Sequence, residues 1–250
     1  MSKTKQAYSD YYKDLDTAIG GDERFAWVND VLLKTLTGKA VLDVGCGEGS
    51  LLKMLKDKDN NVFGIDASET GRLSCLKKGV DCAVIDISAE RFPCDNDSFD
   101  LVLCLETIEH IENPHHCVWE IKRVLKEGGV FIVSIPNQKI LHPYIYPGLF
   151  DLKNFKKFLE LNSFEIKEIK GWGQAGMLNK TARWLKSKNS ALAGSIAAGI
   201  HFLSRKRNLL MRKHIGCPLN CSYSVNFICL NRKKDKTLLE EIALQTRPGK

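Results

Sequence analysis

The chain has 250 residues, of which 44% are hydrophobic and 27% charged, and its formal net charge is +7. This size and composition fit one large globular domain with a complete core, and leave room for a sizeable insertion. The polar start lacks the apolar region of a signal peptide, and no apolar run reaches the roughly 18–20 residues that span a bilayer. We therefore expect a cytoplasmic location.

The nine cysteines are an odd number with scattered spacings. Most of them lie in apolar, strand-like runs, which predicts buried free thiols in a reducing compartment. Cys217 and Cys221 lie close together after His214. A CxxxC pair without a second pair is a weak metal signal, so we expect these two to be loop cysteines.

Hydrophobic periodicity predicts alternating strands and helices through the first half of the chain. The expected elements are a helix over 25–36, a strand over 40–44, a helix containing 51–55, a strand over 62–65, a helix over 69–78, strands over 83–85 and 99–105, a helix from Pro114 to about Lys126, and a strand over 130–135. Continuous apolar strands separated by helices predict an α/β fold with a mostly parallel sheet covered on both faces.

The regular alternation of predicted strands and helices ends after residue 150. A helix is predicted over 152–161, an edge strand over 164–169 and a last strand over 224–230. The connection between these strands is far longer than a hairpin needs. We therefore expect one domain over 1–170 and 224–234, a helical insertion over 171–223 and a polar tail over 235–250.

The positive charge is concentrated in this insertion. From Ile169 to Lys234 there are thirteen Lys and Arg residues and no Asp or Glu, while the rest of the chain is acidic. Residues 177–213 combine an amphipathic stretch, an apolar run too short to span a membrane, and basic flanks. This pattern predicts a lid that lies on an anionic membrane surface, or alternatively a helical subdomain packed on the core with a solvated basic face.

A glycine-rich turn, Val41–Gly49, follows the first predicted strand. Gly45 and Gly47 let the backbone turn tightly and approach a ligand. Asp66 ends the next strand about 20 residues beyond the first glycine, where a carboxylate can accept hydrogen bonds from two ribose hydroxyls. A nucleoside ligand is therefore predicted, and Ser50 stands where a dinucleotide site has its third glycine.

With Asp43 two residues ahead of the glycines, the region from about Lys39 to Asn137 resembles the class I S-adenosylmethionine-dependent methyltransferases. It is most similar to methyltransferase type 11 and to ubiquinone-biosynthesis O-methyltransferases. Further matches are Asp86 with Ile87, the strand Phe99–Val102, and the helix end Arg123–Gly129. The resemblance implies a Rossmann-like sheet of seven strands whose last strand is antiparallel and lies between the fifth and sixth.

The resemblance also implies S-adenosylmethionine as cofactor and a set of residues that bind it. Asp43 would help to hold the methionine moiety, Asp66 the ribose and Asp86 the adenine amino group. The full set is Asp43, Gly45, Cys46, Gly47, Asp66, Ala67, Asp86, Ile87 and Leu105. Methyl transfer from a sulfonium is an in-line displacement, so much of the catalysis would be positioning.

Glu106, Glu109 and His110 follow the fourth predicted strand. In a helix they would share one face, where two carboxylates and an imidazole can hold a divalent metal or form a general base. The pattern resembles ubiquinone-pathway O-methyltransferases and small-RNA 2′-O-methyltransferases, in which such residues bind a metal. Those families use another histidine further on, and Tyr146 takes that place here, with His142 four residues away.

We expect His110 and Glu109 to be the catalytic residues, and the identity of any metal stays open. An ordinary helix start with a structural role is the alternative for this segment. The expected function is O-methylation of a small-molecule or lipid-like acceptor. The alternatives are an RNA methyltransferase, which the basic segment would suit, and a non-catalytic methyltransferase-like protein that works through partners.

Overall fold

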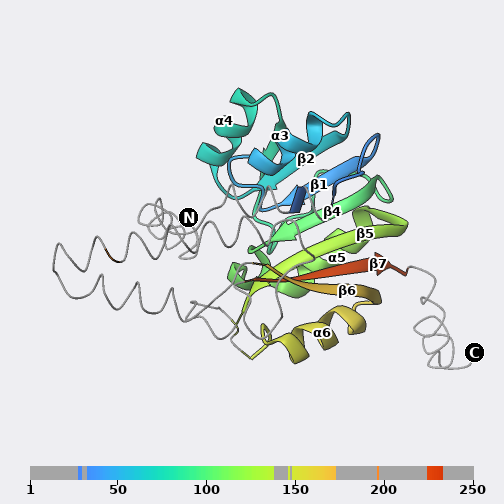
Figure 1. Ribbon diagram of the computed structural model, residues 1–250. Helices are drawn as coiled ribbons and strands as arrows, with labels where there is room; N and C mark the ends of the chain where they lie inside the picture. Colours follow the sequence, from blue (N-terminus) through green and yellow to red (C-terminus); the bar gives the residue numbers. More distant parts are fainter. Residues whose placement is uncertain are drawn as a thin grey trace, which may run out of the picture.

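A computed structural model describes residues 28–29, 33–137, 146, 148–172, 196 and 224–232. These residues form one seven-stranded sheet in the order β3-β2-β1-β4-β5-β7-β6 (Figure 1). The strands are β1 (Ala40–Val44), β2 (Asn61–Asp66), β3 (Asp81–Val84), β4 (Phe99–Leu105), β5 (Leu125–Pro136), β6 (Phe164–Trp172) and β7 (Ser224–Asn231). The helices are α3 (Ser50–Lys56), α4 (Glu69–Lys77), α5 (Pro114–Val124), α6 (Leu152–Leu161) and the 3₁₀ turn η2 (Ile108–His110).

The first five strands pair in parallel, and β7 is the antiparallel member. It runs between β5 and β6 and is antiparallel to both. The α/β class, the seven strands and the place of the last strand are therefore confirmed. β6 forms one edge of the sheet and β3 the other, so the predicted edge position of the 164–169 strand is also confirmed.

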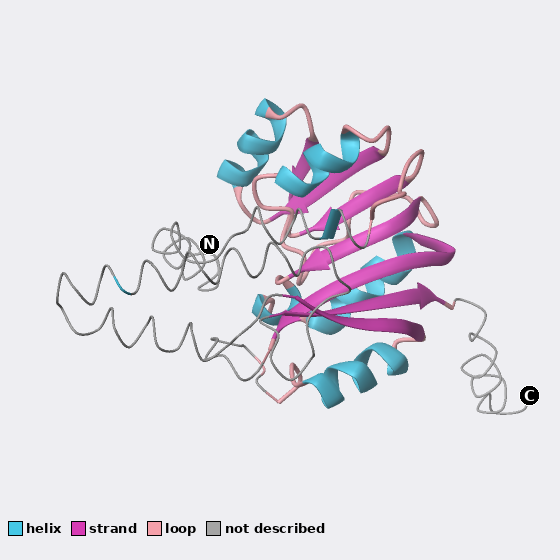
Figure 2. Ribbon diagram, viewed as in Figure 1, coloured by secondary structure: helices cyan, strands magenta, loops and turns pink. Residues whose placement is uncertain are grey.

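Side chains on alternate positions of the strands enter two separate cores. On one face Leu42 and Val102 belong to a cluster that includes residues of α5 and α6. On the other face Val41 and Leu101 belong to a cluster that includes residues of α3 and α4. Both faces of the sheet are thus covered by helices, as Figure 2 shows. This double covering explains why β1 and β4 are mostly apolar, with one aspartate in each strand, Asp43 and Asp100.

Local sequence signals set the ends of the two helices α5 and α6. Asn113 Oδ1 accepts the His116 N–H at 3.0 Å, and Pro114 occupies the first turn of α5. The Asp151 side chain caps α6 in the same way, accepting the Asn154 N–H at 2.8 Å. These are the caps that side-chain acceptors favour, because the first N–H groups of a helix have no partner within it.

Helix α5 ends at Val124, whereas the sequence predicted an end near Lys126. The chain passes directly into β5, whose pairing with β4 jumps from Phe99–Leu125 to Leu101–Val130. Gly128 has a positive φ of 69° within this irregular stretch. The glycines therefore serve an irregularity in the strand and not the end of the helix.

Most other predicted elements are present at or within a few residues of their expected bounds. The third strand is Asp81–Val84 and not 83–85, because it extends back along β2 in register. Residues 33–35 form a bend and turn, so the predicted helix over 25–36 does not reach its expected end, and half of it lies outside the described residues.

The insertion and tail predicted at 171–223 and 235–250 lie almost entirely outside the described residues. Within the described residues, no helix has the length and apolar character that crossing a membrane requires. The seven cysteines in this part of the chain are all free, and all but Cys94 are buried, as predicted.

Candidate active site

The carboxyl ends of β1, β2 and β4 meet at one edge of the sheet. Strand order runs outward in opposite directions from the β1–β4 pair, which makes this pair the switch point of the sheet. In open α/β sheets, ligands bind in the crevice outside such a point. The glycine turn after β1, Asp66 at the end of β2 and Glu106 after β4 are therefore at the expected place.

The glycine turn adopts backbone conformations that other residues rarely tolerate. Gly45, Gly47 and Gly49 have φ of 77°, 54° and 72°. A Cβ on Gly45 would lie 2.3 Å from the Thr107 Cγ2 atom, so this glycine also permits close packing against the segment after β4. A Cβ on Gly47 would meet nothing within 4 Å. The turn is therefore fixed on one side and open to a ligand on the other.

Asp66 connects β2 to the glycine turn. Its Oδ2 atom accepts the Gly47 N–H at 2.9 Å, and its Oδ1 atom accepts the Ser68 N–H at 2.8 Å. Burial raises the pKa of Asp66, and the hydrogen bonds from Gly47 and Ser68 oppose that rise. The carboxylate holds the turn in place while keeping lone pairs for further donors.

The other predicted cofactor residues lie along the same edge. Asp43 is 5% exposed in β1, where it pairs with Gly64 of β2 and Leu103 of β4. Asp86 follows β3 and accepts the Ser88 N–H at 3.0 Å and the Ser88 hydroxyl at 2.6 Å. Ala67 is exposed, whereas Ile87 and Leu105 are buried.

The donor and acceptor types at this edge suit an adenosine. Ribose hydroxyls and an adenine amino group are donors, and Asp66 and Asp86 supply carboxylate acceptors at the ends of successive strands. The open side of Gly47 lets a ligand approach the backbone closely. The residues present therefore fit the cofactor that the sequence predicted.

Glu106 does not share a helical face with Glu109 and His110, so that prediction is wrong. The backbone φ of Glu106 is 51°, which is not helical. Between this residue and the start of α5, the regular structure consists of the 3₁₀ turn η2 alone. The Oε1 atom of Glu106 accepts the hydroxyls of Ser134 at 2.8 Å and Ser224 at 2.7 Å. These bonds turn the carboxylate toward β5 and β7. Neither serine was predicted, although Ser134 stands out as a polar residue in an apolar run.

Glu109 and His110 form a compact pair in the 3₁₀ turn η2 after β4. The Glu109 side chain is fully buried, and the His110 side chain is 11% exposed with its Nε2 atom 3.6 Å from Glu109 Oε1. The His110 N–H donates to the Thr107 carbonyl at 3.0 Å, and Thr107 is the residue that packs on Gly45. The backbone of His110 is therefore linked to the glycine turn through a single residue, and Thr107 is a site component that sequence reasoning missed.

Tyr146, which the sequence predicts at the place of the second histidine of the resembling families, donates its hydroxyl to the Glu112 carbonyl at 2.7 Å. His142 lies outside the described residues. Within the described part of the chain, the one group of three candidate metal ligands whose atoms lie within 4.8 Å of one another is Cys46, Cys75 and Cys82. The ligand atoms of Glu106, Glu109 and His110 do not form such a group.

Comparisons with known proteins identify the family of the chain. Residues 42–133, from β1 through most of β5, match the family described as Methyltransferase domain. The "Ubiquinone biosynthesis O-methyltransferase" of Glaesserella parasuis is 31% identical over 180 residues, which cover 60% of this chain and 74% of that protein.

Solved structures share the fold at low identity. A SAM-dependent methyltransferase from Archaeoglobus fulgidus matches with a TM-score of 0.59 and 17% identity over 88% of this chain and 99% of its own. The [4+2]-cyclase SpnF matches with a TM-score of 0.57 and 19% identity over 84% and 81%. Together, the site and the curated relative establish that the chain belongs to the class I S-adenosylmethionine-dependent methyltransferases and uses S-adenosylmethionine as its cofactor.

Proposed function

We propose that the enzyme methylates a hydroxyl group on a small-molecule or lipid-like acceptor. The observation that carries this proposal is the pair of His110 and the fully buried Glu109 in the turn η2, which directly follows Thr107, the residue that packs on Gly45. A hydroxyl must lose its proton as the methyl group is transferred, and His110 would accept it. The buried carboxylate stabilises the charge that the imidazole then acquires.

The cofactor assignment is part of the same proposal. Asp66 would receive the ribose hydroxyls, Asp86 the adenine amino group, and Asp43 the methionine moiety, with Ile87 and Leu105 lining the site. The positions of these residues along one strand edge support it. The curated relative with the O-methyltransferase name supports oxygen as the methylated atom.

The test is a radiolabelled-methyl assay on lipid, small-molecule and RNA fractions of a cell extract, with and without a chelator. We expect label in the lipid or small-molecule fraction, on an oxygen. His110→Ala should lower kcat by roughly 10²–10⁴-fold, because it removes the base, and should leave the affinity for S-adenosylmethionine unchanged.

His115→Ala is the matched control, because His115 is an exposed histidine at the start of α5. It should retain full activity. Label that appears only in RNA, or a His110→Ala variant as active as the parent, would overturn the proposal. If the chelator abolishes methyl transfer, a metal ion would instead be needed where the acceptor binds.

We also propose that residues 171–223 form a separate insertion, in which the basic segment 177–213 attaches the enzyme to the cytoplasmic face of an anionic membrane. The support is the absence of acidic residues from Ile169 to Lys234 together with thirteen basic ones. The enzyme would then reach a lipid-like acceptor within the membrane in which that acceptor is dissolved.

A further inference from the structure

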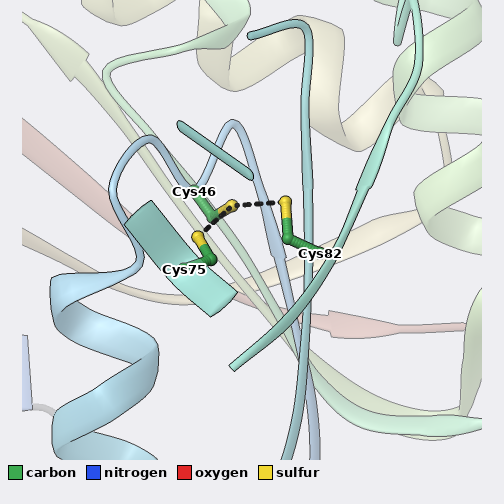
Figure 3. Close-up of side chains that lie close together, drawn as sticks. All are labelled: Cys46, Cys75 and Cys82. Atoms are coloured by element: carbon green, nitrogen blue, oxygen red, sulfur yellow. Dashed lines mark hydrogen bonds between the residues drawn. The ribbon is translucent and has the colours of Figure 1, made fainter. Parts of the chain in front are cut away.

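Three cysteine thiols from three different elements meet beneath the glycine turn (Figure 3). Cys46 belongs to the turn itself, Cys75 to α4 and Cys82 to β3. The Cys46 sulfur lies 3.5 Å from that of Cys82 and 3.9 Å from that of Cys75. All three residues are at most 9% exposed. The proposed methyl transfer uses none of these thiols.

The spacing of the sulfurs matches that of thiolates around one metal ion. Zinc–sulfur bonds of about 2.3 Å at tetrahedral angles place two sulfurs about 3.8 Å apart. The separations of 3.5 Å and 3.9 Å lie on either side of this value, and the three sulfurs lie within 4.8 Å of one another. A cation at their centre would need only small movements of the side chains.

Two glycines create the space that these sulfurs occupy. A Cβ on Gly64 of β2 would lie 2.7 Å from the Cys46 sulfur, and a Cβ on Gly49 would lie 2.7 Å from the Cys75 sulfur. Any other residue at either position would displace a thiol. The Gly47 carbonyl oxygen lies 3.4 Å from the Cys75 sulfur, which places an oxygen acceptor beside the cluster.

We propose that Cys46, Cys75 and Cys82 form a binding site for one thiophilic d¹⁰ cation of the Zn²⁺ or Cu⁺ class. Soft thiolate ligands select such ions over Mg²⁺ and Ca²⁺. On binding, each thiol releases one proton and each sulfur forms one bond to the ion. The ion would join the glycine turn, α4 and β3, and so stiffen the turn from below.

The experiment uses the full, reduced, metal-free protein with Co²⁺ and Zn²⁺ as probes. Co²⁺ should produce an intense sulfur-to-metal charge-transfer absorption at one equivalent. Zn²⁺ should displace the Co²⁺ and release close to three protons per ion, since only thiolates coordinate. Zn²⁺ at 100 times its Kd should raise the Tm by roughly 5–10 °C.

Cys75→Ser and Cys82→Ser should each abolish the charge-transfer absorption and weaken Zn²⁺ binding by at least roughly 100-fold, because each removes one of three direct ligands. Cys94→Ser is the matched control, since Cys94 lies outside the cluster and is half-buried. The double variant Cys217→Ser/Cys221→Ser tests the other closely spaced pair. Both controls should bind the probes as the parent does.

The proposal fails if the parent protein shows no charge-transfer absorption with Co²⁺. In that case the three cysteines are thiols that pack together without binding a metal ion. It also fails if the Cys217/Cys221 variant alone loses the signal. The parent titration decides the question even if a cysteine variant does not fold. The readouts are independent of methyl transfer, so this proposal and the proposed acceptor chemistry can fail separately.

Discussion

At the scale of single residues, Glu106 joins three strands at the edge where the ligand is expected. Its left-handed backbone is uncommon for a residue other than glycine. Its N–H donates to the Ser134 carbonyl at 3.1 Å, and its carboxylate receives the Ser134 and Ser224 hydroxyls. These contacts hold the strained turn that directs the chain from β4 toward Glu109 and His110.

Asp66→Ala should weaken S-adenosylmethionine binding by roughly 10–100-fold, because charge-assisted hydrogen bonds contribute about 1.5–3 kcal/mol. The loss has two sources: the contacts to the ribose and the hydrogen bond that holds Gly47. Isothermal titration calorimetry measures it. Asp81→Ala removes the same charge from an exposed position at the other end of β3 and should bind normally. Equal affinities for parent and Asp66→Ala would disprove the assignment.

The residue-level predictions succeeded where a motif determines the backbone. The tight turn at Gly45 and Gly47 was predicted correctly, because glycines at this spacing indicate positive φ values. Glu106 was misplaced because its partners, Ser134 and Ser224, come from strands far along the chain. The cysteine cluster was not foreseen, since it depends on how α4 and β3 pack against the turn.

At the scale of elements, helix α5 is tied to the connection between β3 and β4 by one buried ion pair. Glu120 is fully buried, and its Oε2 atom accepts the Phe92 N–H at 2.7 Å and an Arg123 N–H at 2.6 Å. Arg123 also donates to the carbonyls of Cys94 at 2.8 Å and Phe92 at 3.0 Å. The ion pair thus explains structurally the Arg123 of the helix end that the resemblance singled out.

Glu120→Gln should lower the free energy of unfolding by about 3–5 kcal/mol, because it leaves Arg123 buried without its counter-charge. Burial acts to raise the pKa of Glu120, but the hydrogen bonds from Arg123 and Phe92 outweigh it, and the pKa is lowered. Its stabilisation is therefore present near neutral pH and is lost as the pH falls through the lowered pKa.

Urea unfolding at several pH values measures both effects. The parent should lose stability on acidification below the ordinary glutamate pKa of 4.5 more steeply than Glu120→Gln. Lys156→Ala, which removes an exposed ion pair with Glu160 on α6, should change the unfolding free energy by no more than about 1 kcal/mol. A Glu120→Gln variant as stable as Lys156→Ala would refute the role assigned to this pair.

Element boundaries were predictable where capping and periodicity agree, as for α6, whose Asp151 cap and amphipathic pattern gave Leu152–Leu161. They were not predictable at the α5–β5 junction. There the hydrophobic pattern continues through Leu125, and strand pairing with Phe99 decides that this residue belongs to the sheet.

At the scale of the whole molecule, charge is distributed unevenly along the sequence: one segment is basic and the remainder of the chain is acidic. Deleting 177–213 should abolish salt-sensitive flotation with anionic vesicles and leave S-adenosylmethionine binding intact, because the cofactor edge lies in the described sheet. Flotation assays at low and high salt test this. Binding that persists after the deletion, or that the parent never shows, would contradict the membrane proposal.

The strands on either side of the predicted insertion are direct neighbours. Trp172 at the end of β6 pairs with Ser224 at the start of β7, so the two ends of the connection are held side by side. For a flexible chain closed at both ends, doubling its length costs only about 0.6 kcal/mol in conformational entropy. The sheet therefore tolerates connections of very different length at this point. Evolution can therefore exchange this connection, which we propose to meet the acceptor, while the sheet that carries the cofactor edge stays the same.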